Sequence, residues 1–292
     1  MSETPSTQRF GVTGVTGGIG SRVATRLADA GFAPVLVARD PARVPGIPGA
    51  PVRLAEYDDP PALERAFAGV TTLFLVSAAE HPDRVRLHRQ AVDAAAAAGV
   101  QRIVYTSFLG AAPDSTFTFA RDHWATEQHL RASPVAFTAL RDSLYQDDLP
   151  FFADRAGVMR GPAGDGAVGA VARSDIADVA VRVMLEADVH DGRVYDLTGP
   201  DAWTLGEVAA ELSAVTGREV RFENETEDEA YASRAGQGAD FEIAGWVTSY
   251  QAIATGELST VTDTVEQLTG RPALSFREFL QREPGSYQHL VR

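Results

Sequence analysis

The sequence predicts an α/β fold with a doubly wound, mainly parallel sheet and a smaller α+β lobe at its C-terminus. Two observations predict it. Short apolar segments alternate with helix-period segments through the first half, and a glycine-rich turn joins the first apolar segment to the first helix. Apolar strands buried on both faces are typical of parallel strands joined by right-handed crossovers. We expect residues 1–150 to form the main domain, residues 151–292 to form the smaller lobe, and residues 173–200 to rejoin the main sheet.

Each element follows from a local pattern. The strand FGVTG runs into the glycine turn, and SRVATRLADAG continues as a helix because Ile19, Val23 and Leu27 share one face. Gly31 stands where a helix C-terminal cap is expected. The later elements are expected as strand 33–39, helix 62–70, strand 71–78, helix 83–100, strand 101–107, helix 117–130, strand 136–143, helix 174–187, strand 192–200 and helix 205–217.

Composition narrows the classes of function. The 292-residue chain has 26 basic and 40 acidic residues, a formal charge of −14, which argues against nucleic acid or an anionic membrane as a partner. It has no cysteine, which excludes disulfides, thiolate nucleophiles and zinc–thiolate sites. The N-terminal MSETPSTQR lacks the apolar core of a secretory signal, and no apolar run approaches the roughly 18–20 residues of a membrane span. We expect a cytoplasmic protein, with a homodimer as one arrangement.

The glycine-rich turn predicts a site for a nucleotide cofactor. Glycine permits a tight turn, lets the backbone approach a pyrophosphate and allows close helix–strand packing. The N-terminus of the following helix presents free N–H groups and a partial positive charge to the phosphates. The turn and the start of the helix contain the residues Gly14, Thr16, Gly17, Gly18, Ile19 and Gly20.

The end of the second strand indicates which cofactor binds. NAD enzymes usually place an acid there for the ribose 2′-hydroxyl, whereas this chain has Arg39, with Arg43 nearby. A guanidinium suits a 2′-phosphate, so we expect NADP(H) over NAD(H), although Asp40 could still turn inward. Asp58, after the third strand, is expected either at the adenine edge or as a helix N-cap.

Several blocks together resemble the NmrA-like branch of the atypical short-chain dehydrogenase/reductases, and within it the NAD(P)H:quinone oxidoreductase-like members. The blocks include VTGVTGGIG, VARDPAR, YTSFLGA, TALRDSLYQDDL, SDIADVA and TGRPALSFREFL, so the resemblance covers nearly the whole chain. The resemblance implies an N-terminal NADP-binding Rossmann domain, a small C-terminal lobe and a cleft between them.

The resemblance also implies roles for individual residues. The glycine turn would form the phosphate loop, and Arg39 would hold the 2′-phosphate. Ser77 and Ala78 would line the adenosine ribose, and Thr106 and Ser107 would approach the nicotinamide. His123 stands where many relatives have a lysine that binds the nicotinamide ribose, and Phe119 replaces their tyrosine acid.

The missing tyrosine limits the chemistry. A ketone needs its developing alkoxide protonated, whereas a quinone gives a hydroquinone anion that is far more stable, so a weak donor or water suffices. His123, oriented by Glu127 one turn on, is the best candidate donor; it could also only hold the ribose, or pack. Ser107 is a second candidate donor. Tyr145 would line the acceptor pocket or lie in the core.

We therefore expect an oxidoreductase that uses NADPH without metal or flavin and passes hydride to a small conjugated acceptor, most readily a quinone. Two alternatives stay open: a biosynthetic reductase for a ketone, enone or imine, and a catalytically silent NADP-binding sensor. The five histidines other than His123 show no metal-ligand spacing and are expected at the surface.

Overall fold

The computed structural model describes residues 8–291, and its centre is a seven-stranded parallel sheet of order β3-β2-β1-β4-β5-β6-β9. The order reverses direction between β1 and β4, which is the arrangement that creates a ligand crevice at the carboxyl ends of the strands. The sheet strands are β1 (Phe10–Val12), β2 (Val35–Ala38), β3 (Val52–Leu54), β4 (Thr72–Leu75), β5 (Arg102–Phe108), β6 (Ala136–Asp142) and β9 (Val194–Leu197). The predicted doubly wound fold is confirmed.

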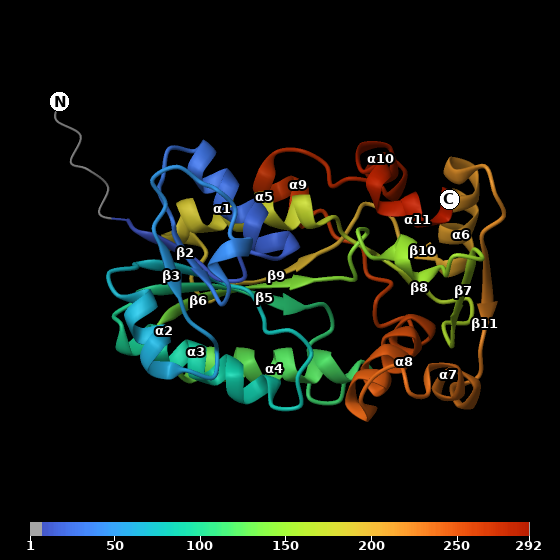
Figure 1. The fold of residues 1–292 in the computed structure, drawn as a ribbon, viewed down its shortest axis with the longest axis horizontal. Coiled ribbons are helices and arrows are strands. Elements are labelled where there is room, and N and C mark those ends of the chain that lie inside the picture. The colour runs from blue at the N-terminus through green and yellow to red at the C-terminus, as the bar shows by residue number, and fades with distance from the viewer. Residues whose placement is uncertain (1–7, 292) are drawn as a thin grey trace.

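Helices cover both faces of this sheet (Figure 1). One layer holds α1 (Gly18–Asp29), α5 (Arg173–Leu185) and α9 (Thr264–Thr269), and the other holds α2 (Pro60–Phe67), α3 (Arg84–Ala97) and α4 (Thr118–Ala132). Helix α5 begins one residue earlier than the sequence predicts. The alanines of α3 that face the sheet are buried, so this helix packs closely on it.

The remaining elements gather at one end of the sheet (Figure 1). They include two small sheets, in which β10 pairs with β8 and β11 pairs with β7. These elements are β7 (Val158–Gly161), β8 (Ala167–Val168), β10 (Trp203–Thr204), β11 (Arg221–Asn224), α6 (Leu205–Thr216), α7 (Glu227–Arg234), α8 (Asp240–Ala254), α10 (Phe276–Arg282) and α11 (Gln288–Val291). The segment 173–200 contributes α5 and β9 to the main sheet and its helix layer.

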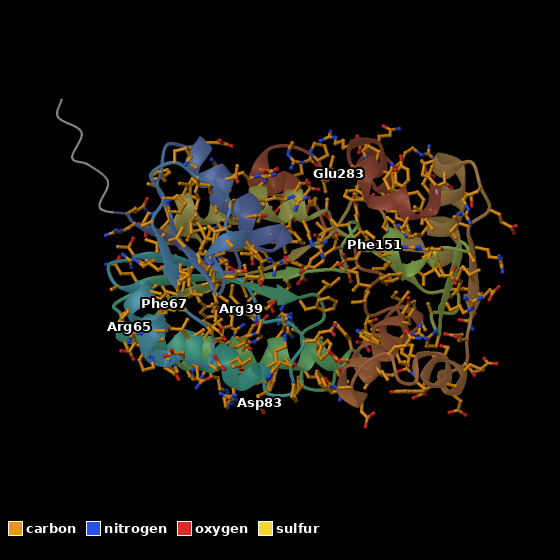
Figure 2. The ribbon with its side chains drawn as sticks, viewed as in Figure 1. Arg39, Arg65, Phe67, Asp83, Phe151 and Glu283 are labelled. Carbon is orange, nitrogen blue, oxygen red and sulfur yellow. The ribbon has the colours of Figure 1, made fainter. Side chains whose placement is uncertain are left out.

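Apolar side chains fill the space between the layers (Figure 2). Val12, Leu36 and Phe74 pack beneath α1 and α5, and Phe67 lies fully buried in the core on the opposite face. A third cluster, which includes Phe276, forms the core of the C-terminal elements. These cores fix the carboxyl edge of the sheet, where the candidate site lies.

Candidate functional site

The turn between β1 and α1 forms a cradle for phosphate. Gly14 adopts a positive φ of 61°, and a Cβ there would lie 2.9 Å from Val76. A Cβ at Gly20 would lie 2.6 Å from the carbonyl oxygen of Thr13, so the strand and helix approach closely only because these positions are glycine. The N-cap, Gly17, supplies no side-chain cap. The first N–H groups of α1 are therefore available to a ligand, and the turn fits a pyrophosphate.

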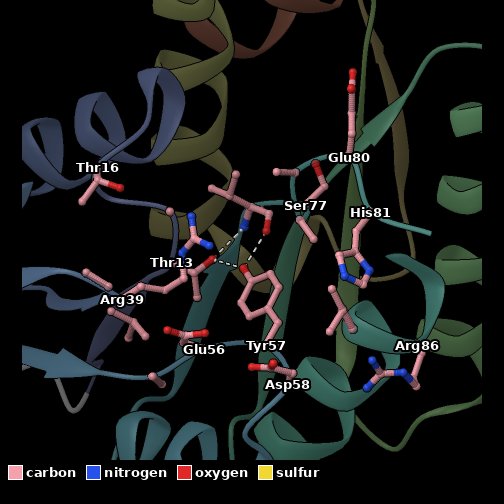
Figure 3. Close-up of a pocket in the computed structure, with 18 residues that line it drawn as sticks. Thr13, Thr16, Arg39, Glu56, Tyr57, Asp58, Ser77, Glu80, His81 and Arg86 are labelled. Atoms are coloured by element: carbon pink, nitrogen blue, oxygen red, sulfur yellow. Dashed lines mark hydrogen bonds between the residues drawn. The ribbon is translucent and has the colours of Figure 1, made fainter. Parts of the chain in front are cut away.

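A cavity of about 390 Å³ opens beside this turn, at the carboxyl ends of β1, β2 and β4 (Figure 3). Such a volume suits part of a dinucleotide. Of the residues predicted to bind cofactor, Gly14, Thr16, Arg39, Asp58, Ser77 and Ala78 line it. Gly17, Gly18, Ile19 and Gly20 form the adjoining turn and first helical residues, whereas Thr106 and His123 lie outside the cavity.

Arg39 and Asp40 have different surroundings at the end of β2. Arg39 is exposed and lines the cavity. The carboxylate of Asp40 instead accepts a hydrogen bond from the N–H of Ala42 at 2.9 Å and caps the short helix Pro41–Arg43. Asp40 is thus held outside the cavity, where the sequence left open that it could turn inward.

The loop after β3 places two carboxylates and a tyrosine in the cavity wall (Figure 3). Asp58 lines the cavity beside Glu56, and the neighbouring Asp59 is the residue that caps α2. The phenol of Tyr57 donates to the carbonyl of Val76 at 2.6 Å and lies 2.7 Å from the hydroxyl of Thr13. Burial raises the pKa of Tyr57, so its phenol stays neutral. Its hydrogen bonds connect the loops that follow β1, β3 and β4. The sequence offers no signal for this role.

The ends of β4 and β5 are joined by Thr106. Its hydroxyl accepts a hydrogen bond from the N–H of Ser77 at 2.7 Å. The next hydroxyl, that of Ser107, is buried and donates to the carboxylate of Glu127 at 2.6 Å. Ser107 therefore already has an acceptor inside the protein.

Glu127 lies fully buried on α4, where it forms a two-pronged ion pair with Arg141. Both N···O distances are 2.8 Å, from the Nε and Nη2 atoms of Arg141. The expectation that Glu127 orients His123 is wrong, because the arginine on β6 binds both of its oxygens. The pair raises the pKa of Arg141.

His123 is 5% exposed and its two ring nitrogens are both engaged. Its Nε2 lies 3.0 Å from the guanidinium of Arg84, and its Nδ1 lies 2.9 Å from the hydroxyl of Tyr105. A guanidinium can only donate, so Nε2 accepts and the ring proton is on Nδ1. Burial, and then the charge of Arg84, hold the pKa of His123 well below its usual range. The ring is therefore neutral near pH 7, whereas its ordinary pKa would let it act as a proton donor near neutral pH.

A second histidine, His88, is fully buried beside this group, so the expectation of a surface position is wrong for it, as it is for His190, which is also buried. Its Nε2 accepts from the N–H of Ala78 at 2.8 Å, and its Nδ1 lies 2.8 Å from the hydroxyl of Thr126. Arg84 also donates to the carbonyl of Ala78. Both side chains therefore fix a residue that lines the cavity. Their positions within a helix-period segment gave no sign of it.

Tyr145 follows β6 on the other side of the sheet edge. Its hydroxyl lies 3.5 Å from the buried carboxylate of Asp142, and the guanidinium of Arg173 lies 4.5 Å from its ring centre. Burial raises the pKa of Tyr145, which keeps the phenol protonated. Arg173 begins α5 and was not singled out in the sequence.

Phe119 packs against the C-terminal elements. A Cβ at Gly245 on α8 would lie 2.7 Å from the para carbon of the Phe119 ring. Nearby, the indole N–H of Trp246 donates to Glu80, a cavity residue, at 3.3 Å. Helix α8 therefore contacts both α4 and the loop that borders the cavity.

Two absences hold for residues 8–291. No group of three or more histidine, aspartate or glutamate side chains there could hold a metal ion. No helix in the same part of the chain is long and apolar enough to span a bilayer.

Comparisons with known proteins agree with this geometry. Residues 14–187 match the NAD(P)H-binding family. The chain is 36% identical to quinone oxidoreductase 2 of Escherichia coli, over 91% of this chain and 96% of that protein. It is 33% identical to the NAD(P)H azoreductase of Xenophilus azovorans, over 94% and 98%. The crystal structure of the NADPH complex of the E. coli quinone oxidoreductase superposes with a TM-score of 0.84 at 35% identity, covering 94% of this chain and 99% of that one.

Proposed function

We propose, from the premise that this chain belongs to the NAD(P)H-binding family, that it passes hydride from NADPH directly to a conjugated acceptor, in the first place a quinone. The chain is an NAD(P)H-dependent oxidoreductase of the quinone reductase and azoreductase type. The preference for NADPH and the nature of the acceptor are the proposal.

The cofactor preference is supported by Arg39. It is the exposed cation at the end of β2 and lines the cavity, whereas Asp40 is held as a cap. A guanidinium can bind a 2′-phosphate with two charge-assisted hydrogen bonds, whereas its interaction with a neutral 2′-hydroxyl is much weaker. The carboxylates of Glu56 and Asp58, which also line the cavity, would accept hydrogen bonds from the adenosine.

The rest of the cofactor would follow the carboxyl edge of the sheet. The first turn of α1 would hold the pyrophosphate, and Ser77 and Ala78 would border the adenosine ribose. Thr106, at the end of β5, would approach the nicotinamide half. When bound, the cofactor supplies a hydride. The elements beyond residue 150, apart from 173–200 and α9, would form the lobe that receives the acceptor.

One observation carries the choice of acceptor: the polar groups at the nicotinamide end are engaged with one another. Ser107 donates to Glu127, and His123 is neutral and accepts from Arg84. Phe119 offers no proton. A ketone would need such a donor, whereas a quinone becomes a stabilised hydroquinone anion that water can protonate. Tyr145, whose hydroxyl is directed at the buried carboxylate of Asp142, would line the acceptor side.

The test is NADPH oxidation in the presence of a graded series of acceptors. We expect turnover with benzoquinones and naphthoquinones, weaker turnover with azo compounds and enones, and at least a hundredfold lower kcat/KM with simple ketones, which corresponds to about 3 kcal/mol. Equal rates with ketones and quinones would contradict the proposed acceptor. Tight NADPH binding with no turnover on any acceptor would favour the sensor alternative.

A further inference from the structure

Arg173 reaches the phosphate cradle from the start of α5. A Cβ built on Gly18, the first residue of α1, would lie 2.8 Å from Cδ of Arg173 and 3.3 Å from its Nε. The side chain therefore crosses the N-terminus of α1, although its residue is 155 positions away in sequence. Glycine at position 18 is what leaves room for it.

The guanidinium is held from two sides and still has free donors. Its Nη2 donates to Asp148 at 2.6 Å, and its central carbon lies 4.5 Å from the centre of the Tyr145 ring. Within the described part of the chain, no acceptor bonds to its Nε, the nitrogen that lies nearest Gly18. The side chain is 23% exposed, so it can meet a ligand.

The charge around Arg173 is balanced. Arg22 lies beside Gly18 as well, and its guanidinium donates to the Gly18 carbonyl at 2.7 Å. Asp147 lies 3.7 Å from Arg22 and 3.9 Å from Arg173, and Asp148 pairs with Arg173. Two arginines and two aspartates therefore cancel locally in a chain whose formal charge is −14. These four side chains therefore add no net negative charge that would repel an anion at the α1 N-terminus.

We propose that Arg173 is a cofactor ligand, which donates from its guanidinium to the pyrophosphate of NAD(P)H at the N-terminus of α1. The cation–π contact with Tyr145 and the bond to Asp148 fix the planar group beforehand, so little side-chain entropy is lost when the anion binds. The inference rests on the NAD(P)H cofactor and not on the identity of the acceptor. It separates recognition of the pyrophosphate, by Arg173, from recognition of the 2′-phosphate, by Arg39.

The test measures ligand affinity for Arg173→Met and Arg173→Gln by calorimetry, with no acceptor present. The probes are NADPH, NADH and adenosine 2′-monophosphate, which carries the 2′-phosphate without a pyrophosphate. We expect both variants to lower the affinity for NADPH and the affinity for NADH by the same factor, about tenfold. Adenosine 2′-monophosphate should bind within twofold of its wild-type affinity.

Arg26→Met is the matched control, because Arg26 also bridges α1 and α5, through Asp178, but lies in the last turn of α1. It should leave all three affinities within twofold. Unchanged NADPH and NADH affinities in folded Arg173 variants would overturn the proposal. So would an equal loss for adenosine 2′-monophosphate, since that would mean a general distortion of the site. Because no acceptor is used, failure here is distinguishable from failure of the quinone proposal.

Discussion

The two ends of the site differ in how their polar side chains are used. At the end where we propose that the adenosine binds, Arg39, Glu56 and Asp58 are exposed and line an open cavity. At the end where we propose that the nicotinamide binds (the nicotinamide end below), His123 and Glu127 are buried and hydrogen-bonded within the protein. One end offers its polar groups to a ligand, and the other satisfies them internally.

This difference indicates where selectivity and chemistry arise. Exposed charges can discriminate between NADPH and NADH because a ligand must complete their interactions. A closed network stabilises the shape of the sheet edge but has few protons to give. Catalysis would then depend on holding the nicotinamide and acceptor about 3–3.5 Å apart, with proton transfer left to water.

The largest expected effect tests whether the nicotinamide end is a self-contained network. Glu127→Gln leaves Arg141 without its carboxylate, so we expect the free energy of unfolding to fall by about 3 kcal/mol. Urea denaturation measures it. Glu186→Gln, at an exposed pair with Arg182, is the control and should cost less than about 1 kcal/mol. Similar losses for the two variants would show that the buried pair is not structural.

The second effect tests whether the adenosine end is directed at a ligand. Arg39→Ala should weaken NADPH by about 2 kcal/mol, roughly thirtyfold, because it removes charge-assisted hydrogen bonds to the 2′-phosphate. NADH affinity should change less than twofold. Titration of cofactor fluorescence measures both. Arg43→Ala is the control, since Arg43 lies nearby without lining the cavity. An equal loss for NADPH and NADH would contradict the role of Arg39.

The smallest effect concerns pH. The pKa of His123 is lowered in the folded state, so below about pH 6.5 the unfolded chain binds a proton that the folded chain does not. The free energy of unfolding therefore decreases as the pH is lowered below about 6.5. His123→Gln should flatten this decline by up to about 1.4 kcal/mol per pH unit. Denaturation at pH 5.5, 6.5 and 7.5 gives the slopes. His88→Gln should act in the same sense, because the pKa of His88 is lowered too. Slopes that match wild type would mean that the histidines are not buried neutral.

The sequence predicts the fold and the cofactor turn because short stretches of neighbouring residues determine both. The glycines of the turn, the strand periods and Arg39 lie within short stretches whose geometry is known in advance. The network at the nicotinamide end joins residues 39 apart, as with Arg84 and His123, or residues on different elements, as with Glu127 and Arg141. A buried ion pair leaves no local pattern, and an arginine at the start of a helix is ordinarily expected in solvent. For the same reason, no local pattern indicates that Arg173 lies against the N-terminus of α1.

The contact between Phe119 and Gly245 limits what a phenol could do at position 119. The para carbon of Phe119, the atom that bears the hydroxyl in tyrosine, lies against α8. A hydroxyl added there by Phe119→Tyr would enter the packing with Gly245 before it could serve an acceptor. A phenol donor at this position would therefore require α8 to move as well. A single Phe119→Tyr change would therefore add the chemical group without giving it access to an acceptor.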